Sequence, residues 1–155
     1  MRTIDRALLD EATALARGSP RRRKNVNFHP ADDAPSHRLL NAIEPGSYVA
    51  PHRHLEPTKD ETMAILRGRL GVVTFEPTGA VARTLVLEPG SDVLGVTLPA
   101  GTFHSVVSLA PGTVYLESKA GPYRAPTLDE RGAWAPAEQA AGAAAYLEDL
   151  VRLFA

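Results

Sequence analysis

The middle of the chain is a succession of short apolar runs, separated about every 8–12 residues by turns rich in proline and glycine. Runs of this length are typical of β-strands, and no helix-sized segment lies between them. The runs occupy residues 39–43, 63–66, 70–75, 81–87, 93–98, 103–109 and 114–116. This punctuation predicts an all-β sandwich or barrel and argues against alternating parallel β–α units.

Helical patterns flank this β region on both sides. Apolar residues recur at helical spacing over residues 4–17, with Thr3 as the expected N-cap and Gly18 as the expected end. Residues 137–154 are rich in alanine, and their larger apolar side chains recur every three or four residues. These side chains are Tyr146, Leu147, Leu150, Val151 and Phe154. We expect this face to pack on the domain body or on a partner chain.

The expected organisation is therefore one β domain with a helix at each end. The three parts are an N-terminal helix over residues 1–18, a β-barrel domain with an extended leading segment over residues 19–136, and a C-terminal helix over residues 137–155.

Composition excludes several classes of function. Seventeen Lys and Arg against eighteen Asp and Glu give a formal net charge of −1, so no overall field attracts nucleic acid or anionic lipid. The chain has no cysteine, which excludes thiolate metal sites and cysteine nucleophiles. No stretch approaches the roughly 18 apolar residues of a membrane span, and the charged N-terminus does not resemble a signal peptide. We expect a cytoplasmic protein whose partner is a small molecule, not nucleic acid or a membrane.

Three of the five histidines stand in a pattern that suggests a metal site. His52 and His54 lie two residues apart, so on a β-strand both imidazoles would point to the same side. His104 follows a turn at residues 99–101 and would begin another strand. Taken alone, His52 and His54 could be surface residues spaced by chance, and His104 could be a hydrogen-bonded core residue. Together they could supply most of one metal centre.

The order of these residues resembles the two sequence motifs of the cupin superfamily, here at residues 46–68 and 99–104. The resemblance implies a single small jelly-roll barrel, also called a double-stranded β-helix, that binds one divalent metal. The ligands it implies are His52, His54, Glu61 and His104. The spacer before Glu61 is six residues, where three or four are usual in the family. Glu56 and Asp60 therefore remain alternatives.

Longer segments resemble the WbuC-type cupin metalloproteins: residues 25–29, 41–54, 66–70, 121–123 and 134–136. This resemblance spans roughly residues 17–138. Its members are associated with bacterial O-antigen and surface-polysaccharide gene clusters. The reaction of these proteins does not follow from the resemblance; we expect a bacterial protein that acts on a small polar substrate, sugar-derived or anionic. Small cupin barrels often dimerise, so a homodimer is also expected, with the C-terminal helix as a possible interface.

Three neutral imidazoles and one carboxylate suit Fe(II), Mn(II), Ni(II) or Zn(II). Open positions on such a metal would permit Lewis-acid catalysis, water activation or, on iron, O₂ binding. The enzyme would then be a metal-dependent isomerase or an oxygenase-type cupin. The alternative is a non-catalytic, metal-dependent module that binds or senses a small molecule.

Two alternating segments supply further candidates. Arg23, Asn25, Asn27 and His29 would share one face of an extended segment, either at the barrel mouth, where they could bind a carboxylate or phosphate, or on a solvated edge. Tyr115, Glu117 and Lys119 would share one side of a strand. They either face water or line the cavity as candidate catalytic acid–base groups.

Three aromatic residues complete the expectations. Tyr48 has the same parity as His52 and His54, so on a regular strand it would face the cavity and contact substrate. Tyr123 and Trp134 are expected to be packing residues in a lid over the barrel.

Overall fold

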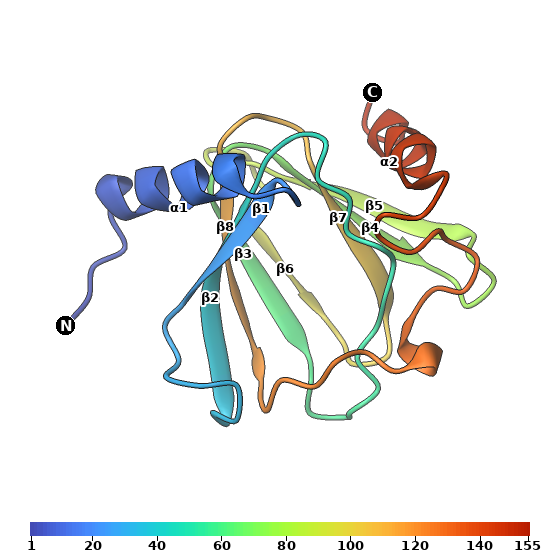
Figure 1. The fold of residues 1–155 in the computed structure, drawn as a ribbon, viewed down its shortest axis with the longest axis horizontal. Coiled ribbons are helices and arrows are strands. Elements are labelled where there is room, and N and C mark those ends of the chain that lie inside the picture. Colours follow the sequence, from blue (N-terminus) through green and yellow to red (C-terminus); the bar gives the residue numbers. More distant parts are fainter.

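The computed structural model describes residues 1–155 and contains eight strands in two antiparallel sheets (Figure 1). The strands are β1 (Arg23–Asn27), β2 (Ser36–Ile43), β3 (Glu61–Arg67), β4 (Leu70–Phe75), β5 (Val81–Leu87), β6 (Gly95–Leu98), β7 (Phe103–Ser108) and β8 (Thr113–Ala120). One sheet has the order β1-β2-β8-β3-β6 and the other has the order β5-β4-β7. The predicted all-β class is confirmed.

Strand β8 occupies the centre of the larger sheet, paired with β2 on one side and β3 on the other. The register aligns residues that are distant in sequence into rows across the sheet. In one row Asn25 pairs with Asn41, Asn41 with Tyr115, and Tyr115 with Ile65. In another, Lys119 stands between His37 and Glu61. Because paired residues point to the same face of a sheet, each row brings its side chains together.

The main core lies between the two sheets, since its members come from strands of both. It consists of the buried residues Ile43, Met63, Ile65, Leu70, Val72, Leu87, Leu98, Val106 and Tyr115. Two further clusters lie where the helices cover the outer faces of the sheets. In this way each sheet buries apolar side chains on both faces, although part of the inner face remains polar.

Helix α1 (Arg6–Gly18) packs on the larger sheet, where its buried side chains contact Leu40, Ala42 and Val114. It begins at Asp5, whose carboxylate accepts a hydrogen bond from the backbone N–H of Leu8 at 3.0 Å. The prediction that Thr3 is the N-cap was therefore wrong by two residues.

Arg67 at the end of β3 ties this sheet to α1. Its guanidinium donates to the Leu9 carbonyl oxygen at 2.6 Å and to the Thr13 hydroxyl at 3.1 Å. Its Nε also donates to the carbonyl oxygen of Gly112, in the turn before β8, at 3.2 Å.

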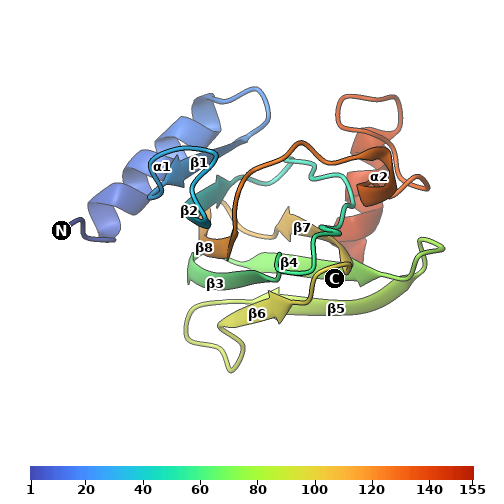
Figure 2. The same cartoon turned by 90° about the horizontal axis from the view of Figure 1, so that it is seen from below.

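Helix α2 (Ala143–Arg152) covers the smaller sheet, far from α1 (Figure 2). It is shorter than the predicted helix over 137–154. Gln139 and Gly142 have positive φ angles of 67° and 88°, which a right-handed helix cannot contain. A short 3-10 helix at Leu128–Glu130 lies in the long connection from β8 to α2. None of the helices has the length and apolar character needed to cross a membrane.

The predicted apolar face of α2 is confirmed as a packing face on the barrel of the same chain. Leu147 and Leu150 are buried against Val73 and Val107, whereas Val151 at the edge of the face is 39% exposed.

We expect Leu150→Ala to lower the free energy of unfolding by about 2–5 kcal/mol, because it leaves a cavity under α2. Val151→Ala is the matched control on the same helix and should change stability by no more than about 0.5 kcal/mol. Urea unfolding followed by circular dichroism would measure both. Equal effects of the two substitutions would contradict the packing described for α2.

Candidate metal centre

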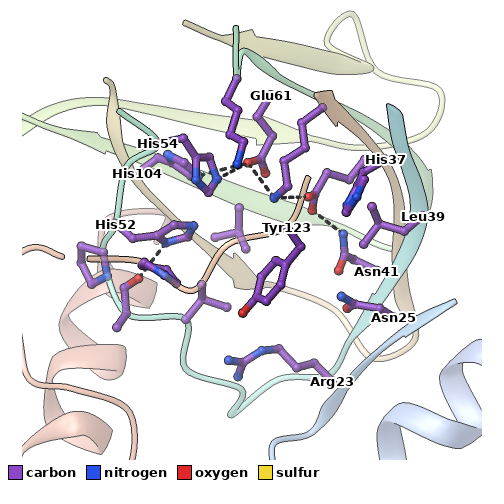
Figure 3. Close-up of a pocket in the computed structure, with 18 of the residues that line it drawn as sticks. Arg23, Asn25, His37, Leu39, Asn41, His52, His54, Glu61, His104 and Tyr123 are labelled. Atoms are coloured by element: carbon purple, nitrogen blue, oxygen red, sulfur yellow. Dashed lines mark hydrogen bonds and ion pairs between the residues drawn. The ribbon is translucent and has the colours of Figure 1, made fainter. Parts of the chain in front are cut away.

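His52, His54 and His104 converge at one side of the barrel interior (Figure 3). One ring nitrogen from each lies within 4.8 Å of the others. His104 belongs to β7, but His52 and His54 lie in an irregular segment, so the strand geometry on which their shared direction was argued is absent. A single antiparallel bridge replaces that strand: the backbone N–H of His52 donates to the His104 carbonyl at 3.0 Å, and the reverse bond is 2.8 Å. This bridge holds the two histidine backbones side by side.

Hydrogen bonds from Nδ1 to backbone carbonyl oxygens define the tautomer of two of these rings, His52 and His104. Nδ1 of His52 bonds to the carbonyl oxygen of Ala50 at 3.0 Å, and Nδ1 of His104 bonds to that of Thr102 at 2.9 Å. A carbonyl oxygen only accepts, so each Nδ1 carries the proton and each Nε2 presents a lone pair. Nε2 of His104 is buried and has no hydrogen-bond partner. An orphaned imidazole nitrogen beside two more imidazoles fits a divalent metal ion.

Glu61, at the start of β3, adjoins this histidine cluster. Its Oε2 is 3.0 Å from Nε2 of His54 and 3.8 Å from Nε2 of His104. The alternatives point elsewhere: Glu56 pairs with Lys59 at 3.3 Å, and Asp60 accepts from the backbone N–H of Ala100 at 2.8 Å. Of the three carboxylates, Glu61 is therefore the one beside the imidazoles, and its role as a ligand stays a prediction.

Burial and neighbouring charges place these groups in the protonation states that metals bind. Burial and the nearby His104 lower the pKa of His52 to about 3, and burial also lowers the pKa of His104. Burial opposes ionisation of Glu61, but the hydrogen bond to His54 and the charge of Lys119 hold its pKa below the usual range. At neutral pH the site thus offers two neutral imidazoles and a carboxylate anion, to which His54 adds a third ring.

Tyr115, Glu117 and Lys119 line the same cavity, from the inner face of β8. Val114 and Leu116, on the opposite face, pack under α1. The three side chains therefore line the cavity and do not face bulk water, since Glu117 is buried and Tyr115 belongs to the core, whereas their acid–base role stays a prediction.

A chain of polar contacts runs from Glu61 into the cavity. Lys119 Nζ lies 3.4 Å from Glu61 Oε2 and 2.6 Å from Glu117 Oε1. Asn41 Nδ2 then donates to Glu117 Oε2 at 2.5 Å. Burial and the charge of Glu61 raise the pKa of Glu117, against the opposing effect of Lys119. For Lys119, burial favours the neutral amine, but the two carboxylates outweigh it and raise the pKa.

The face expected from the N-terminal segment also lines the cavity. Arg23, Asn25 and Asn27 belong to β1, and His29 follows its end and stacks on His37 with ring centroids 3.9 Å apart. Because β1 is an edge strand and both Asn25 and Asn27 are exposed, this face lines the cavity and is also open to solvent, and its role in substrate binding stays a prediction.

Two of the three aromatic predictions were wrong. Tyr48 does not line the cavity: its hydroxyl donates to the Pro136 carbonyl at 2.8 Å, and its ring packs in the cluster under α2. The segment around it is not a strand, so the parity argument fails there. Tyr123 is 57% exposed at the cavity and is not a packing residue. Trp134 does pack, edge-on to Phe103 with ring centroids 4.7 Å apart.

The cavity has a volume of about 1110 Å³, enough for a small molecule. Sequence reasoning missed Asn41, His37 and Glu138 among the residues that line it. Asn41 and His37 could have been found only from the strand register, which aligns them with Tyr115 and Lys119. No sequence signal pointed to Glu138.

Residues 4–87 match the model of a family described as a domain of unknown function, DUF6016. The chain belongs to the DUF6016 family. The search of curated proteins found no relative that matches the chain.

Solved structures resemble this DUF6016 chain in fold. KdgF from Halomonas sp. is 19% identical over 68% of this chain and 84% of its own, with a TM-score of 0.52. A conserved protein of unknown function from Streptococcus pyogenes, SPY1581, is 11% identical over 79% of this chain and 90% of its own, with a TM-score of 0.53.

An oxalate decarboxylase from Bacillus subtilis that has Mn(II) centres is 16% identical over 66% of this chain, with a TM-score of 0.50. This chain spans only 26% of that enzyme. KdgF and oxalate decarboxylase are cupins. The likeness establishes the fold of the present chain as a single cupin jelly roll, as the sequence predicted.

We expect the metal-free protein to lose stability as the pH falls from 6.5 to 5. The folded-state pKa of His52, about 3, lies below the unfolded value of about 6.5, so in this window the unfolded chain binds more protons. Each such imidazole should cost up to about 1.4 kcal/mol per pH unit. Urea unfolding at pH 7, 6 and 5 would measure this, with His52→Gln expected to flatten the dependence. Constant stability over the window would contradict the buried neutral state.

Proposed function

We propose that this chain is a divalent-metal-dependent cupin enzyme that acts on a small, anionic, sugar-derived substrate. The observation that carries the proposal is the buried, unpartnered Nε2 of His104, which faces two further imidazoles beside a chain of acid–base groups. His52, His54 and His104 would hold the metal, with Glu61 as the fourth ligand. Bound there, the metal would supply Lewis-acid polarisation of a substrate oxygen.

The donor set suits Fe(II), Mn(II), Ni(II) or Zn(II). The structural likeness to an enzyme with Mn(II) centres supports including manganese in that set. The enzyme class that we propose is a metal-dependent isomerase or an oxygenase-type cupin.

The residues of β8 would perform the proton chemistry. Glu117, with its raised pKa, can hold a proton inside the cavity and exchange it with a bound substrate. Lys119 pairs with both Glu117 and Glu61, so it keeps Glu61 anionic and positions Glu117. Burial and the nearby Glu117 raise the pKa of Tyr115 well above its ordinary value, which leaves its hydroxyl protonated and able to donate to a substrate oxygen.

The opposite wall would bind the polar groups of the substrate. Asn25 and Asn27 offer amides to hydroxyl groups, and Arg23 and His29 complete this wall. We further propose that the protein is a WbuC-type cupin of the bacterial cytoplasm with a role in surface-polysaccharide metabolism. The motif resemblance over residues 17–138 supports that assignment. A homodimer belongs to the same proposal.

A non-catalytic binding or sensing module is the second candidate. It is favoured by the pairing of Glu61, Lys119 and Glu117 with one another, which satisfies the charges beside the histidines without a reaction. Such a module would bind the same ligand and leave it unchanged.

We expect purified wild-type protein to carry about one divalent metal per chain and His104→Ala to carry none. Chelation of the metal-loaded protein should lower apparent stability by about 2.7 kcal/mol where the metal is present at a hundred times its dissociation constant. Plasma mass spectrometry and thermal unfolding with and without EDTA would measure both.

His37→Ala is the matched control for the metal measurement, because His37 lines the same cavity but lies outside the histidine cluster. It should retain the metal. Absence of metal from the wild type after reconstitution with each of the four ions would contradict the proposed centre.

We expect Glu117→Gln to retain the metal but to lower turnover by about 10²- to 10⁴-fold, as for removal of a general acid–base group. Metal-loaded protein would be incubated with a panel of uronic acids and sugar phosphates, and conversion would be followed by NMR. Binding of a panel member without conversion by the wild type would favour the sensing module instead.

A further inference from the structure

A second charged cluster lies in the cavity, apart from the histidines. The carboxylate of Glu138 bridges two arginines: Arg21 Nη2 lies 3.0 Å from Oε2, and Arg23 Nη2 contacts Oε1. All three residues line the cavity. Figure 3 shows Arg23 on the side of the cavity away from Glu61. This cluster therefore lies across the ligand space from the candidate metal centre.

The guanidinium of Arg23 is held in place by groups other than Glu138. Its Nη1 donates to the Tyr48 carbonyl oxygen at 2.8 Å and to the Ser47 hydroxyl at 3.2 Å. The Ser47 hydroxyl in turn donates to the Arg21 carbonyl oxygen at 2.7 Å. Only 15% of the Arg23 side chain is exposed. A buried, fixed guanidinium with Nη2 directed at a carboxylate has the geometry that binds carboxylate or phosphate groups.

Glu138 belongs to a different part of the chain, the connection that leads from β8 to α2. Residues 131–138 of this connection form much of one cavity wall, and Pro136 is attached to Tyr48 by a single hydrogen bond. The side chain of Glu138 is 31% exposed, about twice the exposed fraction of the Arg23 side chain. Glu138 can therefore leave the two arginines without disturbing the bonds that hold Arg23.

We propose that Arg21 and Arg23 form an anion subsite for a carboxylate or phosphate group of the ligand, and that Glu138 occupies this subsite until the ligand displaces it. The inference rests on the proposed function, because it names how the anionic end of that substrate is held. Two guanidinium groups and one carboxylate carry a net charge of one positive unit. A ligand anion that replaces Glu138 would therefore keep both arginines paired with a negative group. Displacement of Glu138 lowers the apparent affinity for the ligand. The apparent affinity equals the intrinsic affinity multiplied by the fraction of molecules in which the subsite is free.

The test is Glu138→Gln, which keeps the shape of the side chain and removes its charge. Metal-loaded protein would be titrated calorimetrically with inorganic phosphate, sodium glucuronate and neutral glucose. We expect phosphate or glucuronate, or both, to bind about tenfold more tightly to Glu138→Gln than to the wild type, with no change for glucose. A gain for phosphate alone assigns a phosphate group to the subsite, and a gain for glucuronate alone assigns a carboxylate.

Asp149→Asn is the matched control, since Asp149 pairs with Arg152 at 2.9 Å on the exposed side of α2 and its loss removes the same charge. Arg21→Gln combined with Glu138→Gln should abolish the gain. Arg21 is chosen because Arg23 has structural bonds whose loss could prevent folding. An unchanged affinity in folded Glu138→Gln, an equal gain in Asp149→Asn, or a gain that survives Arg21→Gln would overturn the proposal.

A further arm separates this inference from the proposed metal centre. His104→Ala combined with Glu138→Gln should bind the anions about tenfold more tightly than His104→Ala alone. Persistence of the gain without bound metal supports the subsite even if the metal-dependent reaction fails. Loss of the gain in this pair would overturn an anion subsite formed by the two arginines themselves.

Discussion

The central position of β8, hydrogen-bonded to β2 on one side and β3 on the other, is the constraint on which the rest of the structure depends. Because side chains alternate along a strand, β8 contributes to two environments at once. Val114 and Leu116 pack under α1, while Tyr115 and Glu117 face the cavity. The pairing with β3 also places Lys119 beside Glu61 and so connects the polar inner face to the histidine cluster.

This arrangement buries charges in a way that stability alone does not explain. A buried ion pair gives little net stabilisation compared with apolar residues of similar size, because both charges lose their hydration. Glu61, Lys119 and Glu117 nevertheless lie together in the barrel, with Asn41 completing the contacts. Titratable groups with shifted pKa values that line a cavity, here next to the unpartnered Nε2 of His104, are typical of functional sites. These contacts are the physical basis for our proposal that Glu61, Lys119 and Glu117 form part of a ligand site.

The cavity has different chemistry at its two sides. Imidazoles and Glu61 lie on one side, where bonds from the Ala50 and Thr102 carbonyls fix the rings of His52 and His104. On the other side lie Arg21 and Arg23 with the carboxylate of Glu138 between them. A ligand with one metal-coordinating oxygen and one anionic group would match both sides of the cavity.

The sequence by itself determined the fold class, because turns rich in proline and glycine divide the apolar runs into segments of strand length, and those runs became strands. It also indicated the histidine cluster, since His52 and His54 lie within one short segment and His104 follows a marked turn. Predictions from residue spacing were less reliable where the backbone forms neither a regular strand nor a regular helix. The parity of Tyr48 failed because residues around it are not a strand, and the helix expected from residue 137 begins at Ala143 after left-handed residues.

Only the tertiary structure decided which carboxylate adjoins the imidazoles and which polar residues share the cavity. Glu56, Asp60 and Glu61 are close in sequence, but only Glu61 lies in a strand, β3, where it pairs with Lys119 of β8. The contacts of Asn41 with Glu117 and of Glu138 with Arg23 join residues 76 and 115 positions apart. Such pairs depend on the order of strands in the sheet and on the path of the connection after β8. Both are set by long-range packing, which leaves no periodic signal in the sequence.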